Sequence, residues 1–385
     1  MAGFTFNTAP SIIFGAGSLS RIGELAATRL GPHVMIVTDA GLVRAGLIAP
    51  ALAALHEAGI AVEVYDQVVA DPPEAVVVEA VDRARGFGAE AIIGLGGGSS
   101  LDVAKLVALL SKSGESLGDV YGVGIAKGPR LPLLLAPTTA GTGSEVTPIS
   151  IVTTGAHEKK GVVSPILLPD IALLDPDLTL GLPAPVTAAT GVDAMVHAIE
   201  AYTSLSPNNN PVSRALACEA LRLLGRNIRR AVHHGADRFA RSAMLLGSML
   251  AGQAFANSPV AAVHALAYPI GGHFGVPHGL SNALVLPHVL RFNASACAEA
   301  YAELLPHVFP DLPQAYGIEG AERFIESLAD LSVDLGLQPR LRDVGIPADA
   351  VPMMAEDAMR QTRLLVNNPR PITLDDARAI YEAAW

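Results

Sequence analysis

The chain has 385 residues, of which half are hydrophobic and only 16% are charged, and its formal net charge is −11. The length is sufficient for two domains, and so much apolar material requires a large core or a subunit interface. The negative charge, with no block of Lys or Arg, argues against binding to nucleic acid or to an anionic membrane surface. We therefore expect an oligomer, with a homodimer as the simplest form.

Three features predict a soluble cytoplasmic protein. Cys218 and Cys297 lie far apart and outside any CxxC pattern, which fits a reducing compartment. The first residues, MAGFTFNTAPSIIFGAG, lack the basic and apolar regions of a signal peptide. The sequence contains no uninterrupted run of about 18 apolar residues, so we expect no membrane span.

In the first half of the chain, short apolar runs alternate with helical patterns. The helices are expected over 74–88 and 100–112. The expected strands are VMIVTD (34–39), AVEVYD (61–66), residues 91–95 and the apolar run that opens LPLLLAPTTAGTGSE (131–145). This alternation predicts βαβ units, and hence a mainly parallel sheet with helices on both faces.

After residue 183 the strand signals nearly vanish. Helices are expected over 185–205, 211–233, 238–256, 258–271 and 318–336, with a last one after Thr373. There Thr373 and Asp376 resemble a capping box. The pattern predicts an α/β nucleotide-binding domain with a Rossmann-like parallel sheet at 1–182, followed by an all-helical domain at 183–385.

Two polar loops follow expected strands. GGGSSLDVAK (96–105) leads into a helix, so its backbone could hold a phosphate against the free N–H groups of the helix N-terminus, although a tight turn without a ligand is the alternative. PTTAGTGSE (137–145) repeats the design. Because ligands bind at the carboxyl ends of parallel strands, the pair favours a nucleotide site. The candidate contacts are Gly97, Gly98, Ser99, Thr138, Thr139 and Thr142.

Asp39 closes the strand VMIVTD. A carboxylate there could accept both ribose hydroxyls of an adenosine, and it would repel a 2′-phosphate, so Asp39 favours NAD over NADP. The alternative is that Asp39 caps the following helix.

The segment GVDAMVHAIEAYT (191–203) has an apolar stripe, with Asp193 and His197 one turn apart on the other side and Glu200 nearby. One interpretation is a solvated polar face, and the other is a pair of metal ligands. His264 and His278 lie in a separate helix and turn, so the four side chains could converge on Zn²⁺ or Fe²⁺ with a position open for substrate. His273 and His288 are further candidates.

Over nearly its whole length, the chain resembles the iron-containing alcohol dehydrogenases. The resemblance rests on motifs in the same order and spacing: GGGSSLDVAK, PTTAGTGSEVTPIS, DPDLTLGLP, GVDAMVHAIEAYTS, VHALAYPIGGHFGVPHGLSNALVLPHV and NPRPIT…AW. It implies the fold that this family shares with dehydroquinate synthase.

The resemblance also implies residue roles. The family's four metal-ligand positions correspond to Asp193, His197, His264 and His278. Its pyrophosphate loop corresponds to Gly97, Gly98 and Ser99, and its NAD-selecting position to Asp39. Its other cofactor contacts correspond to Thr138, Thr139, Thr142, Thr147 and Lys159, with Lys160 as the alternative to Lys159.

One position departs from the family pattern. Many members have His where this chain has Tyr268, and that His passes the substrate proton toward solvent. Since the ordinary pKa of a phenol is about 10, Tyr268 is less suited to this role at neutral pH. Tyr268 or His273 is expected to take the role, unless a ribose hydroxyl and water suffice.

The activity implied by the resemblance is reversible hydride transfer between a small alcohol and NAD, with the metal polarising the substrate oxygen. Fe²⁺ is the expected metal and Zn²⁺ the alternative. Alternatives within the same fold are a polyol dehydrogenase, a maleylacetate reductase, a hydroxyacid-oxoacid transhydrogenase and a dehydroquinate-synthase-like lyase. A non-enzymatic metal- or nucleotide-binding protein is the remaining alternative.

Overall fold

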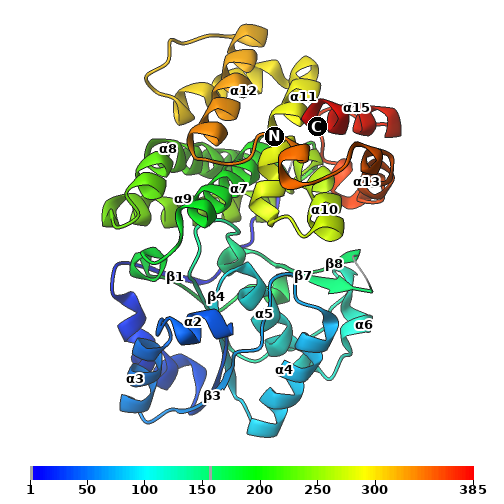
Figure 1. Cartoon of the computed structure of the whole chain (residues 1–385). Coiled ribbons are helices and arrows are strands. Elements are labelled where there is room, and N and C mark those ends of the chain that lie inside the picture. Colours follow the sequence, from blue (N-terminus) through cyan, green and yellow to red (C-terminus); the bar gives the residue numbers. More distant parts are fainter. Residues whose placement is uncertain (1–2, 156–157) are drawn as a thin grey trace. The chain divides into compact units, whose positions relative to one another are not determined.

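A computed structural model describes residues 3–155 and 158–385 (Figure 1). Contacts between residues divide the chain into two compact units. The α/β unit comprises 7–139 and 143–180, and the helical unit comprises 181–385 with the segments 3–6 and 140–142.

The α/β unit is built on a six-stranded sheet in which every pair of neighbouring strands is parallel. In spatial order the strands are β1 (Ser11–Phe14), β9 (Ile171–Leu174), β6 (Leu133–Pro137), β4 (Ala91–Gly96), β2 (His33–Val37) and β3 (Ala61–Tyr65). Every residue of β4 and β6 is buried, because helices cover both faces of the sheet. The parallel sheet expected from the sequence is confirmed.

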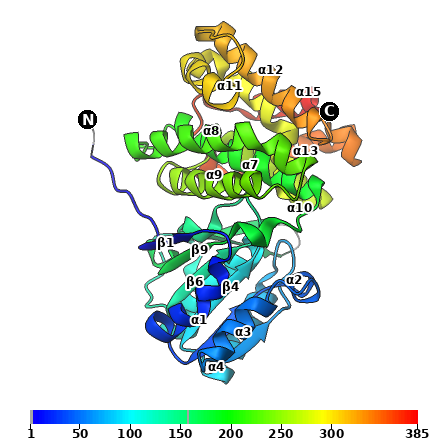
Figure 2. The same cartoon turned by 90° about the vertical axis from the view of Figure 1, so that its left-hand side faces the viewer.

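Alternate residues of the strands enter two separate cores. On one face Met35 and Ile92 pack with α4 (Glu74–Phe87) and α5 (Gly98–Ser113), which are labelled in Figure 1. On the other face Ile36 packs with α1 (Ile22–Leu25) and α3 (Ala49–Glu57), which face the viewer in Figure 2. The sheet is therefore the middle layer of three.

The strand order reverses direction between β2 and β4. From β2 the chain moves outward to β3 at one edge, whereas β4 is followed by β6 and β9 on the opposite side. In open α/β sheets the carboxyl ends of strands at such a switch point form the usual ligand crevice. Asp39 follows β2, and Gly97 follows β4.

A second, three-stranded sheet was not expected from the sequence. Strand β8 (Glu158–Val163) pairs antiparallel with β7 (Ile149–Thr154) and parallel with the short β5 (Gly122–Val123). Short connecting elements complete the unit: α2 (Ala40–Arg44), α6 (Leu117–Val120) and the single turns η1 (Ser18–Arg21), η2 (Ala26–Leu30), η3 (Ser144–Val146), η4 (Pro165–Leu167) and η5 (Pro176–Thr179).

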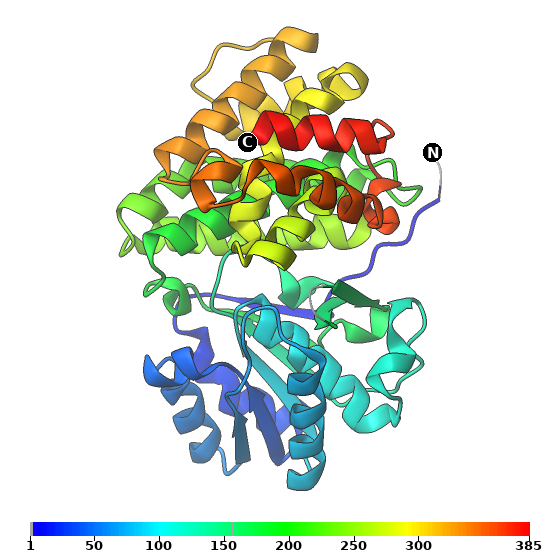
Figure 3. The same cartoon turned by 45° about the vertical axis from the view of Figure 1, so that its right-hand side comes forward.

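The described part of the helical unit contains no strand, as expected. Its helices are α7 (Ala184–Thr203), α8 (Pro211–His233), α9 (Arg238–Asn257), α10 (Ala262–Phe274), α11 (His278–Val308), α12 (Gly317–Asp334), α13 (Val351–Met359), α14 (Thr362–Leu365) and α15 (Leu374–Ala384), with η6 (Leu341–Val344) and η7 (Ala348–Ala350). Helix α7 is in contact with α8, α9 and α11. The last helix, α15 (red in Figure 3), packs on α13 and α11.

Two features of these helices bear on the sequence expectations. Thr373 and Asp376 form the reciprocal bonds of a capping box at the start of α15, so that prediction is confirmed. Helix α11 was not predicted, since Pro287 and Pro306 lie inside it and its backbone kinks at Cys297. None of the helices in the described ranges combines the length and apolarity that a membrane crossing needs.

Candidate functional site

Helix α7 carries three polar side chains on a face that solvent does not reach. Asp193, His197 and Glu200 are each at most 5% exposed. Because the residues of the opposite, apolar stripe are buried as well, α7 is enclosed on all sides from Gly191 to Ala201. The interpretation of this segment as a helix with a solvated polar face is therefore wrong.

Helices α10 and α11 bring two more imidazoles to this face. His264 lies in the first turn of α10 and is 3% exposed, whereas His278 is the first residue of α11. The next residue is Gly279, where an added Cβ would lie 2.3 Å from the carbonyl oxygen of Ala189 on α7. Only glycine allows this approach, which holds the start of α11 against α7.

Asp193, His264 and His278 form a group of possible metal ligands. One ligand atom from each lies within 4.8 Å of the other two. Asp193 Oδ1 is 3.7 Å from Nε2 of His264 and also 3.7 Å from Nε2 of His278. A carboxylate oxygen and two imidazole nitrogens in this arrangement are ligands that Zn²⁺ and Fe²⁺ accept.

Glu200 fixes the orientation of His264. Its Oε2 lies 2.6 Å from Nδ1 of His264, and its Oε1 accepts a hydrogen bond of 2.7 Å from the Val263 backbone N–H. Because an ionised carboxylate can only accept, Nδ1 keeps its proton and donates a hydrogen bond to Glu200, and Nε2 keeps its lone pair on the side of Asp193. The helical period predicts that Glu200 lies near Asp193 and His197 on α7, but nothing in the local sequence indicates that Glu200 contacts His264.

His197, the fourth predicted ligand, lies beside this group but is not part of it. Its ring stacks between Phe255, at 4.3 Å, and His264, at 4.6 Å. Burial lowers the pKa of His197 to about 3, against the opposing effect of Asp193. The imidazole is therefore neutral at physiological pH, as a metal ligand must be.

Asn282 is a further residue of the site, and no motif in the sequence singled it out. Its amide nitrogen donates to Asp193 Oδ1 at 2.6 Å and lies 3.3 and 3.4 Å from the Nε2 atoms of His264 and His278. It follows His278 by four residues on α11 and so shares its face, a spacing that could have indicated it.

The chemistry of this group fits a divalent cation. Asp193 Oδ1 and the Nε2 atoms of His264 and His278 converge on the single amide nitrogen of Asn282, which has two protons for three possible acceptors. Burial opposes ionisation of Asp193, but the surrounding imidazoles and the Asn282 amide hold the pKa of its carboxyl below the ordinary value. A buried carboxylate beside imidazole nitrogens suits a metal ion.

The two polar loops of the α/β unit lie side by side. The Thr138 backbone N–H donates to the Gly96 carbonyl at 3.0 Å, and an added Cβ at Gly97 would lie 3.6 Å from the Thr139 side chain. Gly97 is the N-cap of α5 and, as a glycine, has no side chain to cap that helix. The free N–H groups of its first turn can therefore bind a phosphate, so these residues fit a dinucleotide.

Asp39 serves as the N-cap of α2, as its alternative interpretation proposed. Its Oδ1 accepts hydrogen bonds from the Gly41 and Leu42 N–H groups at 2.8 and 3.1 Å. Both bonds use the same oxygen, so the cap leaves Oδ2 for another donor. Asp39 lies at the switch point of the sheet, next to the loop that begins α5.

Other predicted cofactor contacts are distributed along the 138–159 segment. Thr138 and Thr147 are buried, whereas Thr139 and Thr142 are half-buried. Thr142 groups with the helical unit. Lys159 forms an ion pair with Asp71 and is largely buried, while Lys160 is exposed and pairs with Glu158.

The two candidates for the proton relay have different surroundings. The Tyr268 ring lies 6.1 Å from the His278 ring, beside the group of ligands. The imidazole of His273 is hydrogen-bonded to Asp357, which also pairs with Arg360 at 2.8 Å.

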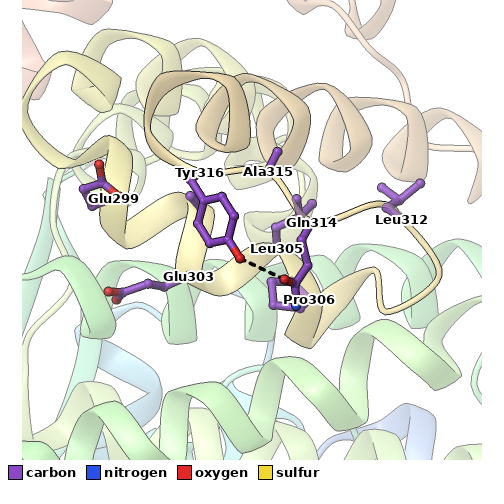
Figure 4. Close-up of a pocket in the computed structure, with 9 residues that line it drawn as sticks. Glu299, Glu303, Leu305, Pro306, Leu312, Gln314, Ala315 and Tyr316 are labelled. Carbon is purple, nitrogen blue, oxygen red and sulfur yellow. Dashed lines mark hydrogen bonds between the residues drawn. The ribbon is translucent and has the colours of Figure 1, made fainter.

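A pocket of the helical unit lies apart from these residues (Figure 4). It lies beside α11 and the segment that leads to α12, and Tyr316 donates a hydrogen bond to Gln314 at its edge. Its lining shares no residue with the predicted site.

Comparisons with known proteins find matches along most of the chain. The iron-containing alcohol dehydrogenase model matches residues 9–176, and the model for the C-terminal part of that family matches residues 187–385. Long-chain-alcohol dehydrogenase 1 of Geobacillus thermodenitrificans (strain NG80-2) is 42% identical, over 95% of each chain.

Solved structures share the fold of this chain. A 1,3-propanediol oxidoreductase superposes over 100% of both chains with a TM-score of 0.96 at 35% identity. The sulfoacetaldehyde reductase of Bifidobacterium kashiwanohense in complex with NAD+ gives a TM-score of 0.88 at 28% identity, over 100% of this chain and 99% of its own.

Proposed function

Because the chain belongs to the iron-containing alcohol dehydrogenase family, we propose that it catalyses the reversible NAD-dependent oxidation of a small alcohol to an aldehyde or ketone. The observation that carries this proposal is the convergence of Asp193, His264 and His278 within 4.8 Å of one another. A buried carboxylate with two imidazoles has few structural uses, whereas it matches a metal site that binds substrate oxygen.

The proposed ligands of the metal ion are Asp193, His197, His264 and His278. Fe²⁺ is the proposed metal, because the family is iron-containing, and Zn²⁺ is the alternative. When bound, the ion supplies a Lewis acid that polarises the substrate oxygen. Glu200 holds His264 in the tautomer that this role needs.

The proposed NAD site lies at the carboxyl ends of β2, β4 and β6. Free N–H groups at the start of α5 bind the pyrophosphate, and Asp39 accepts hydrogen bonds from the adenosine ribose. NAD held there would supply the acceptor and donor of the hydride. The proposed contacts are Asp39, Gly97, Gly98, Ser99, Thr138, Thr139, Thr142, Thr147 and Lys159.

For the proton of the substrate hydroxyl, we propose Tyr268 as the group that accepts and releases it. Its position beside the His278 ring supports this role. His273 is the second candidate, and its hydrogen bond with Asp357 makes it less available to exchange a proton with the substrate.

Relatives of the chain act on different substrates within one reaction type, as their names show: 1,3-propanediol dehydrogenase, sulfoacetaldehyde reductase and lactaldehyde reductase. We propose that the substrate of this chain is an alcohol or its carbonyl product. We also propose that the chain acts as a cytoplasmic homodimer. The two free cysteines support the reducing compartment, and the high apolar content supports the dimer. Light scattering of the purified protein tests the dimer.

The decisive experiment is NAD reduction against a panel of alcohols, polyols and hydroxyacids, with metal analysis of the same preparation. We expect NADH to accumulate with at least one alcohol, in proportion to bound metal. His264→Ala should lose both metal and turnover, whereas His233→Ala, an exposed histidine of α8, should keep both. Full activity in His264→Ala would contradict the metal assignment, and absence of NADH with every alcohol would contradict the reaction.

A further inference from the structure

Lys105 is a fully buried lysine. It belongs neither to the group of possible metal ligands nor to the glycine loop, residues 96–98. It lies on α5, two turns after the glycine loop at the start of that helix. Its ammonium group donates to Ser144 Oγ at 2.7 Å, to Thr147 Oγ1 at 3.1 Å and to the Ile149 carbonyl at 2.6 Å. An ammonium has three protons, so all of its donors are satisfied.

Asp102 completes the same network from the previous turn of α5. Its Oδ1 lies 3.6 Å from the Lys105 ammonium and accepts a hydrogen bond of 2.6 Å from Ser144 Oγ. Its Oδ2 accepts a bond of 2.9 Å from the Ile151 N–H. The two charged residues therefore hold a continuous segment, 144–151, which begins in the second polar loop and continues into β7.

A charged pair is an unusual choice for this position if its purpose is stability alone. Removing two charges from water costs several kcal/mol, and apolar residues of similar size often replace buried ion pairs without loss of stability. What apolar residues cannot do is fix the direction of three hydroxyl and carbonyl groups. The network therefore specifies the conformation of the 144–151 segment rather than adding to its hydrophobic core.

We propose that Asp102 and Lys105 are positioning residues for the dinucleotide, a role that rests on the proposed function. Helix α5 begins with the loop that binds the pyrophosphate, and one to two turns later it holds the second loop by these two side chains. One rigid helix thus sets the spacing between both loops. Lys105 has no exposed surface, so it acts through the loop and not by contact with a phosphate.

The test is direct binding of NADH, followed by fluorescence, to the full-length metal-loaded chain and its variants. Lys105→Met and Asp102→Asn should raise the Kd for NADH roughly tenfold or more, the effect of misplacing one or two hydrogen bonds to the ligand. Ser144→Ala, a smaller change that leaves the ammonium one acceptor short, should raise it less. Lys112→Met, which alters an exposed lysine of the same helix, should leave the Kd unchanged.

Two further readouts separate positioning from folding. In the folded variants the metal content should be unchanged and KM for NAD should rise more than kcat falls, because the metal ligands belong to the other unit. If Lys105→Met has a lower Tm but an unchanged Kd for NADH, the positioning role is overturned while the proposed function stands. If Lys105→Met does not fold, the same result in Ser144→Ala overturns the positioning role. A wild-type chain that does not bind NADH would overturn the proposed function as well.

Discussion

At the scale of single residues, the candidate metal site depends on which nitrogen of His264 carries the proton, and Glu200 determines this. Glu200 uses both carboxylate oxygens, one for the Val263 N–H and one for His264. A neutral amide cannot accept from both donors, because one of its two polar atoms is itself a donor. Glu200 therefore determines whether Nε2 of His264 is free to bind a metal ion, although Glu200 is not itself a proposed ligand.

We expect Glu200→Gln to weaken metal binding by about 10- to 100-fold, the usual effect of losing such a partner of a ligating histidine. Competition with a chelator on the purified protein measures this affinity. Glu303→Gln is a suitable control, since Glu303 accepts a hydrogen bond from Tyr202 outside the ligand group. An unchanged affinity in Glu200→Gln would show that the tautomer of His264 does not depend on Glu200.

Glu145 gives the prediction for pH dependence. Burial raises the pKa of its carboxyl from 4.5 to about 7, although its own backbone N–H and Lys105 act in the opposite direction. The folded state thus holds the proton more tightly than the unfolded state. The resulting stability is complete below about pH 4.5 and is lost as the pH rises through 7.

Glu145→Gln does not titrate, so it should become more stable relative to the wild type between pH 4.5 and 7. The expected gain in the free energy of unfolding is of the order of 3 kcal/mol. Urea unfolding of the nucleotide-free proteins at both ends of this range measures it. The same pH dependence in both chains would contradict the raised pKa.

At the scale of elements, the close contact between α7 and α11 places the histidine that opens α11. Gly279→Ala would bring a methyl group against the α7 backbone, and backbone atoms cannot rotate away. The first turn of α11 must then shift, and His278 with it. We expect a loss of about 1–3 kcal/mol in stability and weaker metal binding.

Gly86→Ala is the matched control for that substitution. Gly86 also lies in a helix, α4, but a Cβ there would meet nothing within 4 Å. Alanine should therefore stabilise the protein by about 0.5–1 kcal/mol with no effect on metal binding. Thermal unfolding with and without added metal compares the two variants, and equal responses would contradict the role of Gly279.

The elements also show how far the sequence could predict the structure. Strands β2, β3, β4 and β6 and helices α4 and α7–α9 were predicted because their apolar periodicity is local. The hairpin of β7 and β8 was not, since its residues are only partly buried and its pairing is decided by the partner strand. Helix α11 was missed because internal prolines are a local signal for a break, which tertiary packing overrides here.

The same division applies to the site. Asp193, His264 and His278 were predicted from residue type and spacing together with the family resemblance, and the structure brings them together. The contact of Glu200 with His264 and the position of Asn282 were not predicted, because both depend on how three helices pack. The network of Asp102 and Lys105 was missed for the same reason, although both lie in a motif that the sequence singled out.

At the scale of the whole molecule, the ligand group and the glycine loop belong to different units, so two ligands should protect different segments. Removing the metal with a chelator should speed amide hydrogen exchange in α7, in α10 and at the start of α11, and leave β4 and β6 unchanged. NADH should instead slow exchange in 96–100 and 138–147. A uniform change over both units with either ligand would contradict the assignment of the metal and NADH to these segments.

The burial of helix α7 also limits which amino-acid substitutions this chain can accept. From Gly191 to Ala201 every side chain is enclosed, whether it faces the ligand group or the neighbouring helices. A saturation mutagenesis library should therefore show one unbroken block of intolerance there. New substrate preferences would have to arise in other parts of the chain, where a side chain can be exchanged without dismantling the helix that supports the chemistry.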